Sequence, residues 1–172
     1  MDFGAMDISV GEECGVFGMY DLSGGNVAPT IYYGLYALQH RGQESAGIAV
    51  TDTFAEKNKV FCHKDLGKVN EVFNAENIST LKGNLGVGHV RYSTAGESTH
   101  ENAQPLVLAY IKGTFMLAHN GNLTNAPELR RKLAMGGAIF QSSSSAPIFN
   151  KRRTRYNGFW TSRRNGRKTC LP

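Results

Sequence analysis

Residues 12–18 (EECGVFG) place a cysteine, Cys14, directly before a short run of small and apolar residues. Such a run predicts a short buried strand, so Cys14 stands where the chain enters a sheet. We expect the thirteen residues before it to be a removable leader. Removal would make Cys14 the first residue of the mature chain and a candidate nucleophile. A nucleophilic cysteine would also need a base, a substrate anchor and donors for an oxyanion nearby.

The rest of the pattern predicts many short strands and few helices, in runs rather than in strict alternation. A helix is expected over 29–42, with Gly42 as a left-handed C-terminal residue, and a second over 69–73. A third is expected over 125–135, with Asn125 as its capping side chain. Predicted strands cover residues 14–20, 45–51, 59–63, 85–92, 106–111, 114–118 and 138–141, the pair 106–111 and 114–118 forming a hairpin. This inventory indicates an α+β fold with mainly antiparallel sheets.

Composition limits the class of protein. Apolar residues make up 41% and charged residues 19% of the chain, as in a soluble globular domain. No apolar run approaches the roughly 20 residues that cross a membrane, and residues 1–13 lack the apolar core of a secretory signal. We therefore expect no membrane partner and a cytoplasmic location. Three widely spaced cysteines predict neither a disulfide framework nor a metal site, and Cys62 is expected to be a small buried strand residue.

The net charge of +5 is unevenly distributed. All 14 Asp and Glu but only eleven of the 19 Lys and Arg lie in residues 1–150, so that part carries −3. Residues 151–172 hold the other eight basic residues and no acid. A basic tail on an acidic body would suit a nucleic acid, which leaves a non-catalytic nucleic-acid-binding chain as an alternative function. Because the tail has no recognisable fold, we expect no specific nucleic-acid partner.

Three features could together support a cysteine nucleophile. A freed α-amine at Cys14 would titrate at about 7.7–8.0 and could act as a base beside its own thiol. Arg91, at a strand end, could grip a carboxylate through two hydrogen bonds, or make only a surface ion pair. The Asn120 amide and the Gly121 N–H could bind an oxyanion, or form only a simple turn.

Four ordered motifs resemble class II glutamine amidotransferases, which are N-terminal nucleophile hydrolases with a four-layer αββα fold. They are residues 13–18 (ECGVFG), 38–48 (LQHRGQESAGI), 88–96 (GHVRYSTAG) and 119–123 (HNGNL). The second and third are most similar to the amidophosphoribosyltransferase family. The resemblance covers about residues 10–141.

The resemblance implies a role for each site residue. Cys14 would attack the glutamine side-chain amide and form a γ-glutamyl thioester, with Asn120 and Gly121 as the oxyanion hole. Arg91 would hold the substrate α-carboxylate with Thr94 nearby. Arg41 and Gly42 would shape the loop beside the nucleophile.

The resemblance also implies the partners of an intact family member. That enzyme would be a homotetramer that transfers ammonia from glutamine to phosphoribosyl pyrophosphate, giving 5-phosphoribosylamine, the first committed step of purine synthesis. It would use Mg²⁺, and the leader is similar to that of the branch with a 4Fe–4S cluster. In this chain we expect no cofactor, no metal site, and glutamine as the only substrate.

Similarity ends abruptly at residue 141. Ser145 stands roughly where the family has an Asp that holds the substrate α-ammonium, and no phosphoribosyltransferase domain follows. We expect a leader (1–13), a partial amidotransferase domain (14–141) that is incomplete at its C-terminus, and an aberrant tail (142–172) produced by a frameshift. Weak or absent glutaminase activity follows from this.

Two further alternatives remain open. The chain could be a fragment of another class II amidotransferase, such as a glucosamine-6-phosphate synthase or an asparagine synthetase, although the leader argues against this. It could also be a fragment that misfolds, because sheet edges and apolar faces would be left exposed.

Overall fold

The computed structural model describes residues 14–56, 59–92, 99–110, 113–121, 123–138 and 140. They form one four-stranded sheet in the order β1-β4-β2-β3 and one two-stranded sheet, β5-β6, with every pairing antiparallel. The strands are β1 (Gly15–Tyr20), β2 (Ser45–Thr51), β3 (Val60–Leu66), β4 (Leu85–Arg91), β5 (Leu106–Tyr110) and β6 (Gly113–Leu117). The helices are α1 (Ala28–Ala37), α2 (Val69–Val72), α3 (Ala75–Thr80) and α4 (Ala126–Met135). Two 3₁₀ turns, Gln39–Arg41 and His100–Asn102, complete the order.

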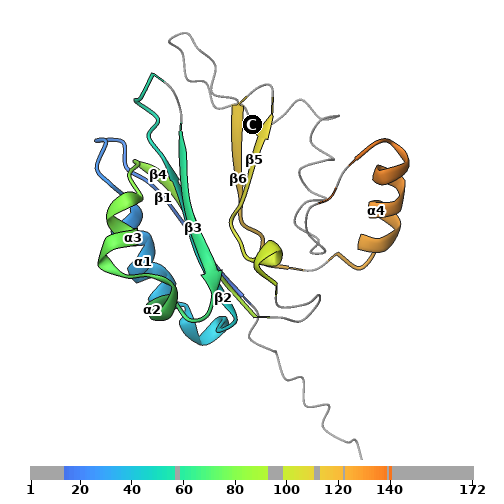
Figure 1. Cartoon of the computed structure of the whole chain (residues 1–172), viewed down its shortest axis with the longest axis horizontal. Helices are drawn as coiled ribbons and strands as arrows, with labels where there is room; N and C mark the ends of the chain where they lie inside the picture. The colour runs from blue at the N-terminus through green and yellow to red at the C-terminus, as the bar shows by residue number, and fades with distance from the viewer. Residues whose placement is uncertain are drawn as a thin grey trace, which may run out of the picture.

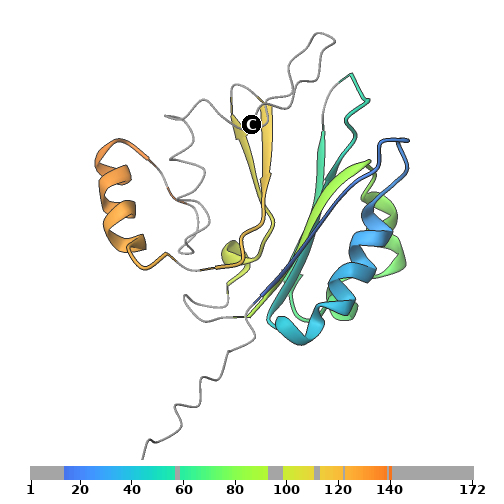
Figure 2. The same ribbon diagram turned by 180° about the vertical axis from the view of Figure 1, so that it is seen from behind.

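These elements lie in four layers (Figure 1). Helices α1, α2 and α3 cover the outer face of the four-stranded sheet, the β5–β6 hairpin faces its other side, and α4 lies beyond the hairpin. The view from behind gives the same order (Figure 2). The layers therefore follow the predicted αββα sequence.

The core lies between α1 and the four-stranded sheet. Ala28, Ile31 and Leu35 follow one another at helical spacing and are fully buried. All seven residues of β2 are buried, as expected for a strand with a neighbour on each side and a layer on each face. A Cβ at Gly88 of β4 would lie 2.6 Å from Ile31 Cγ2, so this position must be small for α1 to pack.

The predicted strands β1 to β6 and the helices α1, α2 and α4 are confirmed, whereas α3 was not predicted. The predicted strand at 138–141 is not confirmed, because Ala138 and Phe140 lie in no strand. The remaining residues of that strand, and the expected leader and tail, lie outside the described residues.

Three local expectations are wrong. Gly42 is extended, with φ −162°, because α1 already ends at Ala37 and a 3₁₀ turn intervenes. Asn125 makes no side-chain cap, since its ψ of 24° departs from the extended backbone that such a cap takes. Cys62 is exposed rather than buried, because β3 is the edge strand of its sheet.

Candidate functional site

Cys14 lies one residue before β1, at the end of the sheet where β4 finishes. Gly15 pairs with Val90, so Cys14 comes level with Arg91 at the end of β4. The Cys14 Sγ lies 3.4 Å from both the backbone N and the carbonyl O of Tyr92, donating to the carbonyl and accepting from the N–H. These two contacts hold the Cys14 thiol against the Tyr92 backbone, just after the end of β4.

Two predicted site residues converge on the Cys14 carbonyl. Arg41 Nε donates to this oxygen at 3.0 Å, and Asn120 Nδ2 donates to it at 3.1 Å. Asn120 is 106 positions away in the chain, so only the tertiary fold brings it to Cys14. The Asn120 nitrogen carries two hydrogens, so one donor remains on the same atom.

Gly42 allows the loop after α1 to approach the end of β4. A Cβ at Gly42 would lie 2.7 Å from the backbone N and C of Arg91. The loop is fixed further by Glu44, whose N–H donates to the Arg91 carbonyl at 3.1 Å. Gln39 Nε2 also donates to the Gly42 carbonyl at 2.5 Å. Gly42 therefore matters for close packing beside Cys14, not for a left-handed backbone.

Arg91 is only 4% exposed, which excludes the surface ion pair considered from the sequence. It pairs with Ser45 of β2, so Arg91, Ser45 and Cys14 lie in one row across the sheet. The Ser45 hydroxyl in this row is buried without a hydrogen-bond partner. A buried guanidinium beside a cysteine is a suitable anchor for a substrate carboxylate.

Gly121 adopts φ +150°, a conformation that favours glycine, and a Cβ there would lie 3.1 Å from His119 Cε1. The segment 119–121 therefore bends sharply where Asn120 reaches Cys14. Partial burial lowers the pKa of His119, while a hydrogen bond to the Gly121 backbone acts in the opposite direction. Thr94, the remaining predicted site residue, lies outside the described residues.

His89 and Gln104 were not predicted as site residues, yet both hold the segment that carries Asn120. His89 lies within the quoted motif at 88–96, and its place there was the only available signal. It is fully buried, and its pKa is lowered to about 4, chiefly by burial and also by the charges of Arg91 and His119. Gln104 lies in no quoted motif.

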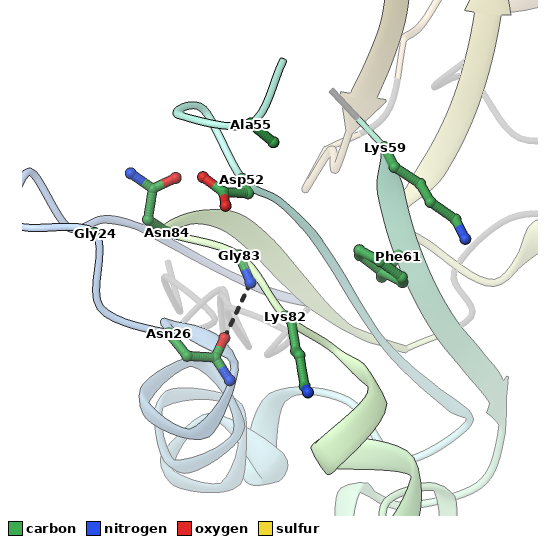
Figure 3. Close-up of a pocket in the computed structure, with 9 residues that line it drawn as sticks. All are labelled: Gly24, Asn26, Asp52, Ala55, Lys59, Phe61, Lys82, Gly83 and Asn84. Carbon is green, nitrogen blue, oxygen red and sulfur yellow. Dashed lines mark hydrogen bonds between the residues drawn. The ribbon is translucent and has the colours of Figure 1, made fainter. Parts of the chain in front are cut away.

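The cavity of about 450 Å³ in Figure 3 lies at the other end of the sheet. It is lined by residues from the loops beyond Tyr20, Thr51 and Leu81, including Asn26, Asp52, Lys59 and Lys82. The Gly83 N–H donates to Asn26 Oδ1 at 3.2 Å across its wall. None of the predicted site residues lines it, so the cavity does not belong to the Cys14 site.

A model of the family described as glutamine amidotransferases class-II matches residues 26–137. The chain belongs to the class II glutamine amidotransferases. It is similar to proteins named amidophosphoribosyltransferase. The one from Methanocaldococcus jannaschii is 50% identical over 135 residues, the one from Bacillus subtilis 49% over 139, and the one from Synechococcus elongatus 55% over 122. These alignments cover 78%, 80% and 71% of this chain, but 28%, 28% and 24% of the relatives.

Two solved structures resemble this class II glutamine amidotransferase. One is described as the allosteric regulatory enzyme of purine biosynthesis (TM-score 0.74, 42% identity). The other is a glutamine phosphoribosylpyrophosphate amidotransferase from B. subtilis complexed with ADP and GMP (TM-score 0.71, 43% identity). Each match covers 85% of this chain and 30% of the other. The predicted fold and family resemblance are confirmed, and the chain spans less than a third of its relatives' length.

No metal site emerges in the part of the amidotransferase that the structure describes. No group of three or more His, Cys, Asp or Glu side chains there could hold a metal ion. No described helix is long and apolar enough to cross a membrane.

Proposed function

We propose that this chain is the glutaminase half of an amidophosphoribosyltransferase, with Cys14 as the nucleophile. The observation that carries the proposal is the convergence of Arg41 and Asn120 on the Cys14 carbonyl, at 3.0 and 3.1 Å. Segments distant in sequence thus meet at the one cysteine that precedes the first strand. The identity of 49–55% to amidophosphoribosyltransferases favours this acceptor chemistry over that of a glucosamine-6-phosphate synthase.

The reaction begins once the leader has been removed. The free α-amine of Cys14 accepts the thiol proton, and Sγ attacks the side-chain amide carbon of glutamine. The resulting oxyanion accepts hydrogen bonds from Asn120 Nδ2 and the Gly121 N–H. The protonated amine then donates its proton to the departing nitrogen, which leaves as ammonia. Water hydrolyses the γ-glutamyl thioester to glutamate and restores the thiol.

The backbone at Cys14 supports removal of the leader. Cys14 has φ +38°, in the left-handed region that residues other than glycine rarely adopt. The angle φ of Cys14 includes the carbonyl carbon of residue 13. Cleavage before Cys14 would therefore remove this torsion and its strain of about 1–3 kcal/mol. We therefore retain residues 1–13 as a leader and begin the amidotransferase domain, 14–141, at Cys14.

Substrate binding and transfer complete the proposal. Arg91 holds the glutamine α-carboxylate with Thr94 beside it, while Arg41 and Gly42 shape the adjoining loop. In a complete homotetrameric enzyme the ammonia reacts with phosphoribosyl pyrophosphate on a further domain, giving 5-phosphoribosylamine. This chain by itself releases glutamate and ammonia in the cytoplasm.

A glutaminase assay tests the nucleophile. The full chain, and a variant without residues 2–13, should form glutamate with turnover well below that of an intact relative. Cys14→Ala should abolish this turnover. A diazoketone analogue of glutamine should alkylate Cys14, detected by peptide mass spectrometry, faster than the exposed Cys62. Turnover that survives Cys14→Ala, or equal labelling of the two cysteines, would overturn the assignment.

A gain-of-function variant tests why activity should be weak. Ser145→Asp would restore the charged acceptor that the family places near the substrate ammonium. A charge-assisted hydrogen bond contributes about 1.5–3 kcal/mol, so KM for glutamine should fall by about one to two decades. Ser144→Asp adds the same charge one position away and is the matched control. Equal effects of the two variants would contradict the proposed role of position 145.

A further inference from the structure

Two side chains from different parts of the fold hold His119, the residue before Asn120. His89 Nε2, on β4, lies 3.2 Å from the His119 carbonyl oxygen. Gln104 Nε2 donates to the same oxygen at 3.3 Å, and Gln104 Oε1 accepts from the His119 N–H at 2.7 Å. Three hydrogen bonds therefore fix one backbone unit directly before the segment that reaches Cys14.

The protonation of His89 follows from its partner. A carbonyl oxygen can only accept, so His89 Nε2 must carry the hydrogen. The other ring nitrogen, Nδ1, is buried without a partner, which favours the neutral ring. Burial, Arg91 and His119 lower the pKa of His89 to about 4, so the ring is neutral at pH 7. A neutral His89 also avoids adding a second positive charge beside Arg91.

Gln104 is itself anchored to the larger sheet. Lys64 Nζ, on β3, donates to the Ala103 carbonyl at 2.5 Å, and His100 Nε2 lies 3.2 Å from the Lys64 carbonyl. Gln104 is 5% exposed and Ala103 is fully buried. Breaking a hydrogen bond between buried polar groups is costly, because the group left behind has neither its partner nor water to bond. The segment 119–121 is thus held by β4 on one side and by β3, through 103–104, on the other.

We propose that His89 and Gln104 are positioning residues that set the distance between the Asn120–Gly121 donors and Cys14. This inference rests on the proposed glutaminase function. Neither residue touches the reacting atoms. Both act through the His119 backbone, and Asn120 Nδ2, one residue further, lies 3.1 Å from the Cys14 carbonyl. Loss of either side chain should misplace the oxyanion donors while leaving the thiol and the carboxylate anchor in place.

Four variants of the full chain test the proposal. Gln104→Met removes both Gln104 hydrogen bonds, and His89→Phe removes the imidazole donor at similar volume. His89→Gln places an N–H near the Nε2 position and should partly rescue activity. His63→Gln is the matched control, because His63 Nε2 lies 3.1 Å from the Val72 carbonyl on α2, in the helical layer, and makes none of the hydrogen bonds to His119.

Gln104→Met and His89→Phe should lower kcat by roughly 10–100-fold and change KM for glutamine less than threefold, since a misplacement of about 1 Å can cost 10²-fold. The alkylation rate of Cys14 by iodoacetamide, which needs the thiolate but not the oxyanion donors, should change less than twofold. His63→Gln should leave kcat within twofold of the unmodified chain. Equal losses of kcat in the His63→Gln control, or unchanged kcat in both other variants, would overturn the inference.

Hydrogen exchange separates this inference from the proposed function. The His119 amide should exchange at least tenfold faster in Gln104→Met and His89→Phe than in His63→Gln. If glutamate formation survives Cys14→Ala yet the exchange rates differ in this way, the glutaminase assignment fails and the positioning contacts stand. If the rates agree among all variants, the positioning role fails whatever the activity.

Discussion

The helix-covered sheet, α1–α3 with β1–β4, and the hairpin region, β5–β6 with α4, are stabilised in different ways. The described hydrophobic core cluster lies entirely within residues 27–90. After residue 91 the buried hydrophobic residues in the described segments are Ala103 and Leu106, and α4 has no buried residue. The hairpin region nevertheless carries Asn120. Burial stabilises the first region, whereas hydrogen bonds to His119 hold the site segment of the second.

The largest expected contrast is in stability. Ile48→Ala, at a fully buried position on β2, should lower the free energy of unfolding by about 2–5 kcal/mol because it leaves a cavity. Met135→Ala on α4, where the side chain is 86% exposed, should change it by about 0.5 kcal/mol or less. Urea denaturation measures both. Comparable losses in the free energy of unfolding would show that burial stabilises the two regions equally.

The next effect depends on pH. The folded pKa of His89 is about 4 and the ordinary value is 6.5, so the unfolded chain binds a proton that the folded chain does not. This difference in proton binding stabilises the folded chain fully above pH 6.5. The stabilisation is lost as pH falls from 6.5 to 4, and the total loss in free energy of unfolding is on the order of 3 kcal/mol. Denaturation between pH 4 and 7 should show this slope, and His89→Gln should reduce it. An identical slope in both proteins would contradict the assignment.

Close packing beside Cys14 gives a smaller effect. Gly42→Ala should cost about 1–3 kcal/mol, because its Cβ would press on the Arg91 backbone and displace the end of β4. Gly18→Ala on β1 is the matched control, since its Cβ would meet nothing nearer than 3.8 Å. Thermal denaturation with the glutaminase assay measures both variants. Equal tolerance of the two substitutions would show that the loop does not need glycine at 42.

The smallest expected effect compares two asparagines that precede helices. Asn74 caps α3, with Oδ1 accepting from the Asn77 N–H at 2.8 Å, whereas Asn125 makes no side-chain cap on α4. Asn74→Ala should cost about 0.5–2 kcal/mol. Asn125→Ala should be close to neutral. Urea denaturation gives the free energy of unfolding of both variants. A larger loss for Asn125→Ala than for Asn74→Ala would show that α4, not α3, depends on its N-cap residue.

Local pattern predicted most elements but missed those that depend on side-chain partners. Apolar runs marked the strands, and helical spacing marked α1. Helix α3 was missed because Ala75–Thr80 is short, and its reciprocal cap between Asn74 and Asn77 leaves no apolar signal. Exposure was mispredicted at Cys62, since sequence alone does not identify the edge strand of a sheet.

The residues of the candidate site also fall into two groups, those predicted from the sequence and those found only in the structure. Residue chemistry predicted Cys14, Arg91, Asn120 and Gly121. Motif resemblance added Arg41, Gly42 and Thr94, and the roles of all seven remain predictions. Hydrogen bonds reached only through folding identified Gln104, which lies in no motif, and gave His89 a partner 30 positions away. Such partners are set by strand register and sheet packing, which single-sequence pattern does not report.

The sequence by itself determined the family, the α+β class, the succession of strands along the chain and the cysteine just before the first strand. These depend on residue type and spacing along the chain, which are visible without coordinates. Only the tertiary structure decided that Gly42 is needed for close approach, that Arg91 is buried, and that His89 and Gln104 meet at His119. Each of these depends on the distance between residues far apart in sequence, and packing of the two sheets sets that distance.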